Sequence, residues 1–78
     1  MNIDTFIANF EESIEGLESG TVNPDTVMRD LPQWDSLAVL TTLAMIDAEY
    51  EVSITANELA DQGTVQELFN LVSQKAGE

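Results

Sequence analysis

The segment 34-WDSLAVLTTLAMIDAEY-50 has an acid and a serine near its start and then carries few charges. Asp35 belongs to the residue types that cap helix starts, because its side chain accepts hydrogen bonds from free amides there. The large apolar residues after it recur at helical steps of three and four. They are Leu37, Leu40, Leu43, Ile46 (or its neighbour Met45) and Tyr50. We therefore predict a helix over residues 36–50 that buries this face.

A second run of apolar residues with helical spacing precedes this stretch. It consists of Ile3, Phe6, Ile7, Phe10, Ile14 and Leu17. The spacing predicts a helix over residues 3–17, which Ser19 and Gly20 end, with Gly20 as a left-handed cap. Residues 21–35 form a long connection, because Pro24 and Pro32 interrupt regular structure. One short turn of helix around residues 25–29 fits this connection.

Two capping boxes follow the central helix. Residues 55–58 read TANE and residues 64–67 read TVQE, and both match the T-x-x-E pattern that satisfies helix-start amides reciprocally. The first box predicts a short helix over residues 56–61, and the second predicts a last helix from residue 65. The fold class is therefore all-α. We expect one domain over residues 1–78, a small four-helix bundle with a short third helix and a long loop between the first two.

The composition narrows the possible functions. The chain has 15 acidic and 2 basic residues, a net charge of −13, no cysteine and no histidine. Without those two residue types, the usual general base, thiolate nucleophile and zinc ligands are missing, so we expect neither an enzyme nor a metal site. The negative charge disfavours nucleic acid and favours partner proteins with basic patches.

The termini and the apolar runs give no sign of export or membrane insertion. The N-terminal sequence MNIDTFIANFEES has no basic segment followed by an apolar block, so it does not read as a signal peptide. The low-charge run over residues 36–46 is too short to span a bilayer. We expect a cytoplasmic protein without membrane insertion, and a monomer.

Ser36 stands at the predicted start of the central helix, where two interpretations are open. A catalytic serine needs a base beside it, and no histidine is present. Serine is common at helix starts simply because it caps amides. Asp35 can already cap, however, and the free amides and positive dipole end of a helix start would stabilise a phosphate on Ser36.

The arrangement of these features resembles the acyl carrier protein family along essentially the whole chain. The residues that carry the resemblance are Asp35-Ser36-Leu37, Glu49-Tyr50 (the family usually has Glu-Phe), Ile54 and Thr64-Val65-Gln66. The resemblance implies that a phosphopantetheinyl transferase attaches 4′-phosphopantetheine from coenzyme A to Ser36, with magnesium. Asp35 would help to orient the serine loop or the metal, and the thiol of the arm would carry acyl groups as thioesters.

The resemblance also implies that an acyl chain can enter the core between the helices. The expected core and acyl pocket comprise Leu40, Leu43, Ile46, Tyr50, Ile54, Leu59, Leu68 and Val72, together with Leu37. Plain packing is the simpler role for most of these side chains. Tyr50 places a hydroxyl near the core edge, where it would need a partner or water.

Members of the family usually have acids along the exposed face of the central helix, and basic partner enzymes recognise them. This chain departs from that pattern. Ala38, Thr41, Thr42 and Ala48 stand where acids are expected. We expect partner enzymes (acyl-loading, condensing or acyltransferase) to dock on Val39, Asp47, Glu49 and Glu51. The cargo class stays open between acyl groups of fatty acid, lipid or polyketide synthesis and aminoacyl or peptidyl groups. An acidic helical adaptor with an unmodified Ser36 is the alternative outside the carrier class.

Overall fold

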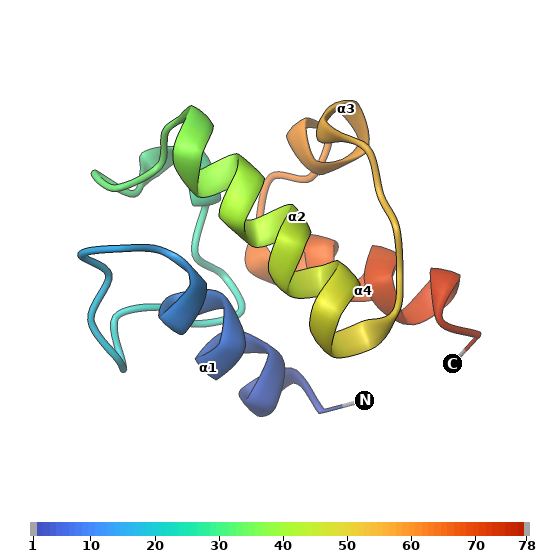
Figure 1. The fold of residues 1–78 in the computed structure, drawn as a ribbon. Helices are drawn as coiled ribbons and strands as arrows, with labels where there is room; N and C mark the ends of the chain where they lie inside the picture. The colour runs from blue at the N-terminus through green and yellow to red at the C-terminus, as the bar shows by residue number, and fades with distance from the viewer. Residues whose placement is uncertain (1, 78) are drawn as a thin grey trace.

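The computed structural model describes residues 2–77, and these form an all-helical fold. The α-helices are α1 (Ile3–Ser13), α2 (Ser36–Tyr50), α3 (Ala56–Ala60) and α4 (Val65–Lys75), with one 3₁₀ turn, η1 (Met28–Asp30), in the long loop. Figure 1 shows α2 crossing the molecule, with α1 on one side, α4 behind it and the short α3 at one end. The predicted small helical bundle with a short third helix is confirmed.

Helix α1 is shorter than the spacing of its apolar residues predicts. Asn2 caps its start by accepting hydrogen bonds from the amides of Asp4 and Thr5. The helix ends at Ser13, whose hydroxyl donates to the carbonyl of Phe10, and the next residue is already extended. Residues 14 and 17 are nevertheless buried, because the chain beyond the helix folds back onto the core. The predicted helix end at Gly20 is therefore wrong.

The long loop between α1 and α2 is tied to the start of α4. The amide of Met28 donates to the carbonyl of Gly63, and the amide of Val65 donates to the carbonyl of Thr26. These bonds form an isolated antiparallel bridge between Val27 and Thr64. Because the first amides of a helix have no acceptor within it, α4 gains partners from the loop and the loop gains a fixed position.

Both T-x-x-E sequences form the predicted capping boxes. Thr55 opens α3 by accepting from the amide of Glu58, and Thr64 opens α4 by accepting from the amide of Glu67. Each glutamate in turn accepts a hydrogen bond from the backbone of its threonine. Two helix starts could therefore be located from local sequence alone.

Helix α2 presents a different face to the core from the one that its leucines indicate. The side chains of Leu37 and Leu40 are 58% and 63% exposed, so the prediction that they lie in the core is wrong. Leu43 and Tyr50 are half-buried and pack at its edge. The buried residues of α2 are Ala38, Thr42, Met45 and Ile46. Ala38 and Thr42 therefore do not stand on an exposed face, contrary to expectation.

The buried face of α2 includes two of its small residues, and one of them, Ala38, lines a cleft together with the end of α1. Ala38 and Thr42 occupy successive turns of one stripe and are 3% and 0% exposed. The hydroxyl of Thr42 has no hydrogen-bond partner among the described residues. A buried polar group in that state costs about 1–3 kcal/mol of stability.

The core is continuous through all four helices and the loops. Its buried apolar residues include Phe6, Phe10, Met28, Ile46, Val52, Ile54, Leu59, Val65, Leu68 and Val72. The predicted core positions of Ile46, Ile54, Leu59, Leu68 and Val72 are thus confirmed. Over residues 2–77, none of the helices has the length and apolar character needed to cross a bilayer.

Candidate functional site

Ser36 is the first residue of α2, and its side chain is exposed. The helix is capped by its neighbour, because Oδ1 of Asp35 accepts a hydrogen bond of 2.8 Å from the amide of Ala38. The hydroxyl of Ser36 makes no hydrogen bond within residues 2–77. Ser36 is therefore not needed as the cap, and its hydroxyl stays accessible to other molecules.

The backbone before Ser36 is held in place by three contacts. The indole of Trp34 stacks on the ring of Phe10 with 6.1 Å between ring centroids. The amide of Trp34 donates to the carbonyl of Leu31, and Nε2 of Gln33 donates to the carbonyl of Gly16 at 3.2 Å. Gly16 adopts φ 85°, which favours glycine, and its open surface leaves room for the Gln33 side chain. Ser36 is thus an exposed residue that follows a backbone segment held in place by these contacts.

The usual residues that activate a serine are not found beside Ser36 among the described residues. The sequence has no histidine or cysteine, and the ammonium of Lys75 pairs with the carboxylate of Glu58 at 3.0 Å, between α4 and α3. No group of three potential metal ligands occurs within the part of the chain that the structure describes. The arrangement can present a hydroxyl to an external enzyme, and within residues 2–77 no side chain that could act as a base is hydrogen-bonded to it.

The start of α2 fits a negatively charged group on Ser36. The first amides of a helix lack intrahelical acceptors, and Asp35 takes only the amide of Ala38 among them. The amides of Ser36 and Leu37 and the positive end of the helix dipole favour an anion at this place. The carboxylate of Asp35 is the opposing contribution, and its role as cap keeps it bound to the helix.

A family model described as the phosphopantetheine attachment site matches residues 9–72. The chain belongs to this family of carrier proteins. The match runs from the middle of α1 into α4 and includes Ser36. No curated protein and no solved structure matches the chain.

Membership establishes the cofactor and the general role. Family members hold 4′-phosphopantetheine covalently, and they are in general non-catalytic carriers that interact with a phosphopantetheinyl transferase and with biosynthetic enzymes. The exposed, uncommitted hydroxyl at the start of α2 fits such an attachment. When bound, the arm supplies a thiol that this chain, without cysteine, does not have.

The exposed side of α2 in this carrier is apolar near Ser36 and acidic farther along. Leu37 and Leu40 form its apolar part, and Asp47, Glu49 and Glu51 are exposed at the far end. Val39 is half-buried and packs against the core, so it offers less surface to a partner than the two leucines. Sequence reasoning missed the leucines because large apolar side chains are usually assigned to the core.

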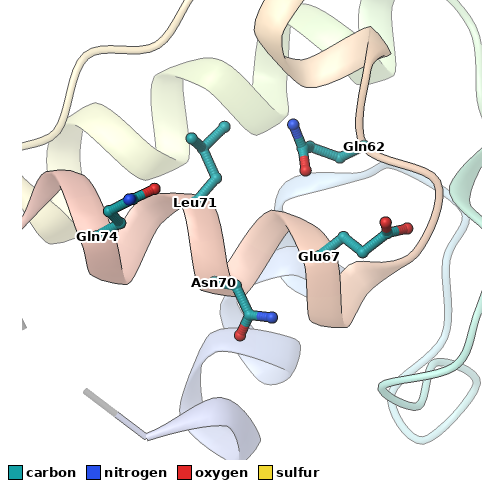
Figure 2. Close-up of a pocket in the computed structure, with 5 residues that line it drawn as sticks. All are labelled: Gln62, Glu67, Asn70, Leu71 and Gln74. Carbon is teal, nitrogen blue, oxygen red and sulfur yellow. The ribbon is translucent and has the colours of Figure 1, made fainter.

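Two hollows of the carrier differ in their relation to Ser36. The larger, of about 590 Å³, is an open depression along α4 and the link before it, lined by the residues in Figure 2. None of these belongs to α2 or to the loop before it. A smaller cleft of about 220 Å³ lies between the end of α1 and the start of α2. It is lined by Ser13, Ile14, Glu15, Asp35, Leu37, Ala38 and Thr41, and thus by both neighbours of Ser36.

Proposed function

We propose that Ser36 is the attachment point of 4′-phosphopantetheine and that the protein carries acyl groups on it as thioesters. The observation that carries this proposal is the free, exposed hydroxyl of Ser36 at a helix start that Asp35 already caps. The family match supports it, because the matched region includes this residue. Within a separate transferase, the Ser36 hydroxyl would attack the pyrophosphate of coenzyme A at the phosphorus that bears pantetheine. The pyrophosphate bond would break, a phosphodiester would form on Ser36, and adenosine 3′,5′-bisphosphate would leave.

Asp35 acts in this proposal as a positioning residue. Its carboxylate holds the first turn of α2 through the amide of Ala38, so the serine next to it keeps one orientation. The side chain of Asp35 is exposed, and its second carboxylate oxygen can contribute to the metal or substrate site of the transferase. Leu37 completes the motif as an exposed apolar contact on the other side of Ser36.

The partner surface in this proposal is the exposed side of α2. Leu37 and Leu40 supply an apolar centre, and Asp47, Glu49 and Glu51 supply an acidic edge for basic residues of the partner. Apolar contacts that become desolvated contribute most of the affinity, whereas exposed charges mainly raise the association rate. This surface fits enzymes that have a basic rim around an apolar depression. They would be the phosphopantetheinyl transferase and acyl-loading, condensing or acyltransferase enzymes.

An acyl chain could be sheltered by the side chains at the edge and centre of the core. Leu43 and Tyr50 line that edge, and Ile46 follows on the same helix. Ile54, Leu59, Leu68 and Val72 complete the proposed pocket from the other elements. An apolar interior favours acyl cargo over aminoacyl cargo, because burying an ammonium group without a counter-charge is costly. Pathways of fatty acid, lipid or polyketide synthesis in the cytoplasm are the corresponding setting.

The proposal can be tested by following cargo on the loaded protein. A phosphopantetheinyl transferase and acyl-coenzyme A should place an acyl-phosphopantetheine on the wild type, and neutral hydroxylamine should release the acyl group because it cleaves thioesters. Ser36→Ala should accept nothing, while Ser53→Ala, which removes an exposed serine in the α2–α3 link, should load like the wild type. Equal loading of Ser36→Ala and the wild type would overturn the assignment of Ser36.

A further inference from the structure

The cleft between the end of α1 and the start of α2 lies directly beside Ser36. Its lining includes both neighbours of Ser36 together with residues 13–15, at and just after the end of α1. Asp35, Leu37 and Glu15 are exposed, so the cleft is open to solvent. Its volume of about 220 Å³ is below the range of about 300–1,000 Å³ typical of pockets that enclose drug-sized ligands. The cleft can therefore hold one part of a molecule that is attached at Ser36.

The polar side chains of this cleft are hydrogen-bond acceptors. The hydroxyls of Ser13 and Thr41 donate to backbone carbonyls of their own helices, at 2.8 and 3.1 Å, and can still accept through their lone pairs. The other polar side chains in the lining are the carboxylates of Asp35 and Glu15, which only accept when they are ionised. Among the described residues, the lining side chains thus offer no uncommitted donor. The cleft suits a group that brings donors of its own.

Glu15 is the carboxylate of this cleft that the fold does not use. Its side chain is exposed and makes no hydrogen bond or ion pair within residues 2–77. The carboxylate of Asp35, in contrast, is engaged as the cap of α2. Substitution of Glu15 should therefore leave the fold intact, whereas substitution of Asp35 would disturb the start of the helix that carries Ser36.

The cleft also has an apolar part. Ile14 and Ala38 contribute buried side chains to it, and Leu37 contributes an exposed one. A group that matches the whole lining combines a small apolar surface with hydrogen-bond donors. A negatively charged group does not match, because the two carboxylates would repel it.

We propose that this cleft holds the part of the phosphopantetheine arm next to Ser36 when no partner enzyme is bound, and that the carboxylate of Glu15 accepts hydrogen bonds from it. The inference rests on the function proposed above and adds a resting site for the arm. The arm carries a dimethyl carbon, a hydroxyl and an amide N–H close to its phosphate, and these supply the apolar surface and the donors that the cleft matches. The phosphate itself matches the first amides of α2 rather than the cleft.

The resting site leaves most of the partner surface on α2 free. Leu40, Asp47, Glu49 and Glu51 do not line the cleft, whereas Leu37 belongs both to the cleft and to the partner surface. An enzyme that docks on Leu37 would disturb the resting site, so docking and release of the arm would be coupled through this side chain.

The experiment uses the full chain loaded on Ser36 with an isotope-labelled phosphopantetheine arm that carries no cargo. NMR measures the nuclear Overhauser contacts of the dimethyl protons and the hydrogen exchange of the two amides of the arm. In the wild type, the dimethyl protons should contact the methyl groups of Ile14 and Leu37. The first amide should exchange about fivefold more slowly than the same amide of free phosphopantetheine, as one hydrogen bond to a surface carboxylate implies. The second amide, nearer the thiol, should exchange as in the free molecule.

Three variants separate a hydrogen bond from a general effect of charge. Glu15→Ala should lose most of the protection of the first amide and weaken the dimethyl contacts. Glu15→Gln keeps an acceptor, so it should retain the contacts and most of the protection. Glu18→Ala removes an exposed carboxylate that does not line the cleft, so it should behave like the wild type.

The outcomes distinguish this inference from the carrier function. Loaded, folded protein whose dimethyl protons do not contact Ile14 and Leu37 would overturn the resting site and leave the carrier function intact. Protection of the first amide that survives in folded Glu15→Ala would do the same. Failure of Ser36 to load would overturn both.

Discussion

Nδ2 of Asn9 in α1 donates a hydrogen bond of 3.0 Å to the hydroxyl of Tyr50, the last residue of α2. The ring of Tyr50 also lies against Phe6, with 5.5 Å between centroids, and Phe6 meets Phe69 of α4 edge-on at the same separation. One aromatic cluster therefore joins three helices at the end of α2 that is remote from Ser36. The polar end of Tyr50 has the partner that its position at the core edge requires.

Replacing Tyr50 with phenylalanine should remove this hydrogen bond and keep the ring contacts. We expect a loss of about 0.5–1.5 kcal/mol in the free energy of unfolding. For a domain of this size, each kcal/mol lowers the thermal midpoint by about 4–8 °C. Denaturant unfolding of the wild type and Tyr50→Phe, with Asn9→Ala and the double variant, measures the coupling. Strictly additive effects of the two substitutions would show that the bond contributes nothing.

Glu11 should matter to the fold much more than its neighbour Glu12. Glu11 is 5% exposed, and its Oε2 accepts a hydrogen bond of 2.9 Å from the buried amide of Val22. Glu11→Ala leaves that amide unpaired, which should cost about 1–3 kcal/mol. Glu11→Gln keeps an acceptor and should recover most of the loss. Glu12→Ala removes the same charge from the surface and should change the free energy of unfolding by less than about 0.5 kcal/mol.

The partner surface predicts opposite effects for two leucines. Leu40→Ala should leave the free energy of unfolding within about 0.5 kcal/mol, because the side chain is exposed. Leu68→Ala should cost about 2–5 kcal/mol, because Leu68 is fully buried. With a transferase, Leu40→Ala should lower kcat/KM about tenfold through lost apolar contact. Unchanged transferase kinetics for a folded Leu40→Ala protein would contradict docking on this side of α2.

Glu58 should titrate below the ordinary range of a glutamate. The backbone amide of Thr55 first, and then the ammonium of Lys75, hold the pKa of Glu58 down by stabilising its charged form. Because the folded pKa is depressed, the stabilising contribution is present above the pKa of the unfolded chain and is lost as the pH falls through the folded pKa. NMR titration of the Glu58 carboxyl measures this. Lys75→Ala should raise the pKa only part of the way, since the bond from Thr55 remains. A folded pKa at or above the ordinary value would contradict the assigned contacts.

The two capping boxes could be predicted from the sequence because each is a local arrangement of a threonine and a glutamate three residues later. The end of α1 could not be predicted in this way. Ile14 continues the helical spacing of apolar residues, but it is buried although its backbone is already extended. The segment after the helix is held by a distant residue, because Nε2 of Gln33 donates a hydrogen bond to the carbonyl of Gly16. The spacing of apolar residues along the sequence does not reveal a contact of this kind.

At the candidate site, the prediction that differs most from the structure concerns which face of α2 is buried. Leu37 and Leu40 fit an apolar stripe with helical spacing. However, α2 carries apolar residues on nearly all of its sides, so the sequence does not distinguish the buried side from the exposed one. The buried face instead contains the small residues Ala38 and Thr42 together with Met45 and Ile46. The place of Ser36 at the helix start could be predicted, because Asp35 next to it signals a cap in the sequence.

The assignment of Ser36 is tested most directly by intact mass after incubation with coenzyme A, magnesium and a phosphopantetheinyl transferase of broad specificity, followed by peptide mapping. Folded wild-type protein should gain the mass of one phosphopantetheine, and the adduct should map to the peptide that contains Ser36. Ser36→Ala should gain none while its circular dichroism and thermal midpoint stay close to the wild type, because Asp35 still caps α2. An adduct on another residue, or no adduct on folded wild-type protein with a transferase that modifies a control carrier, would contradict the account.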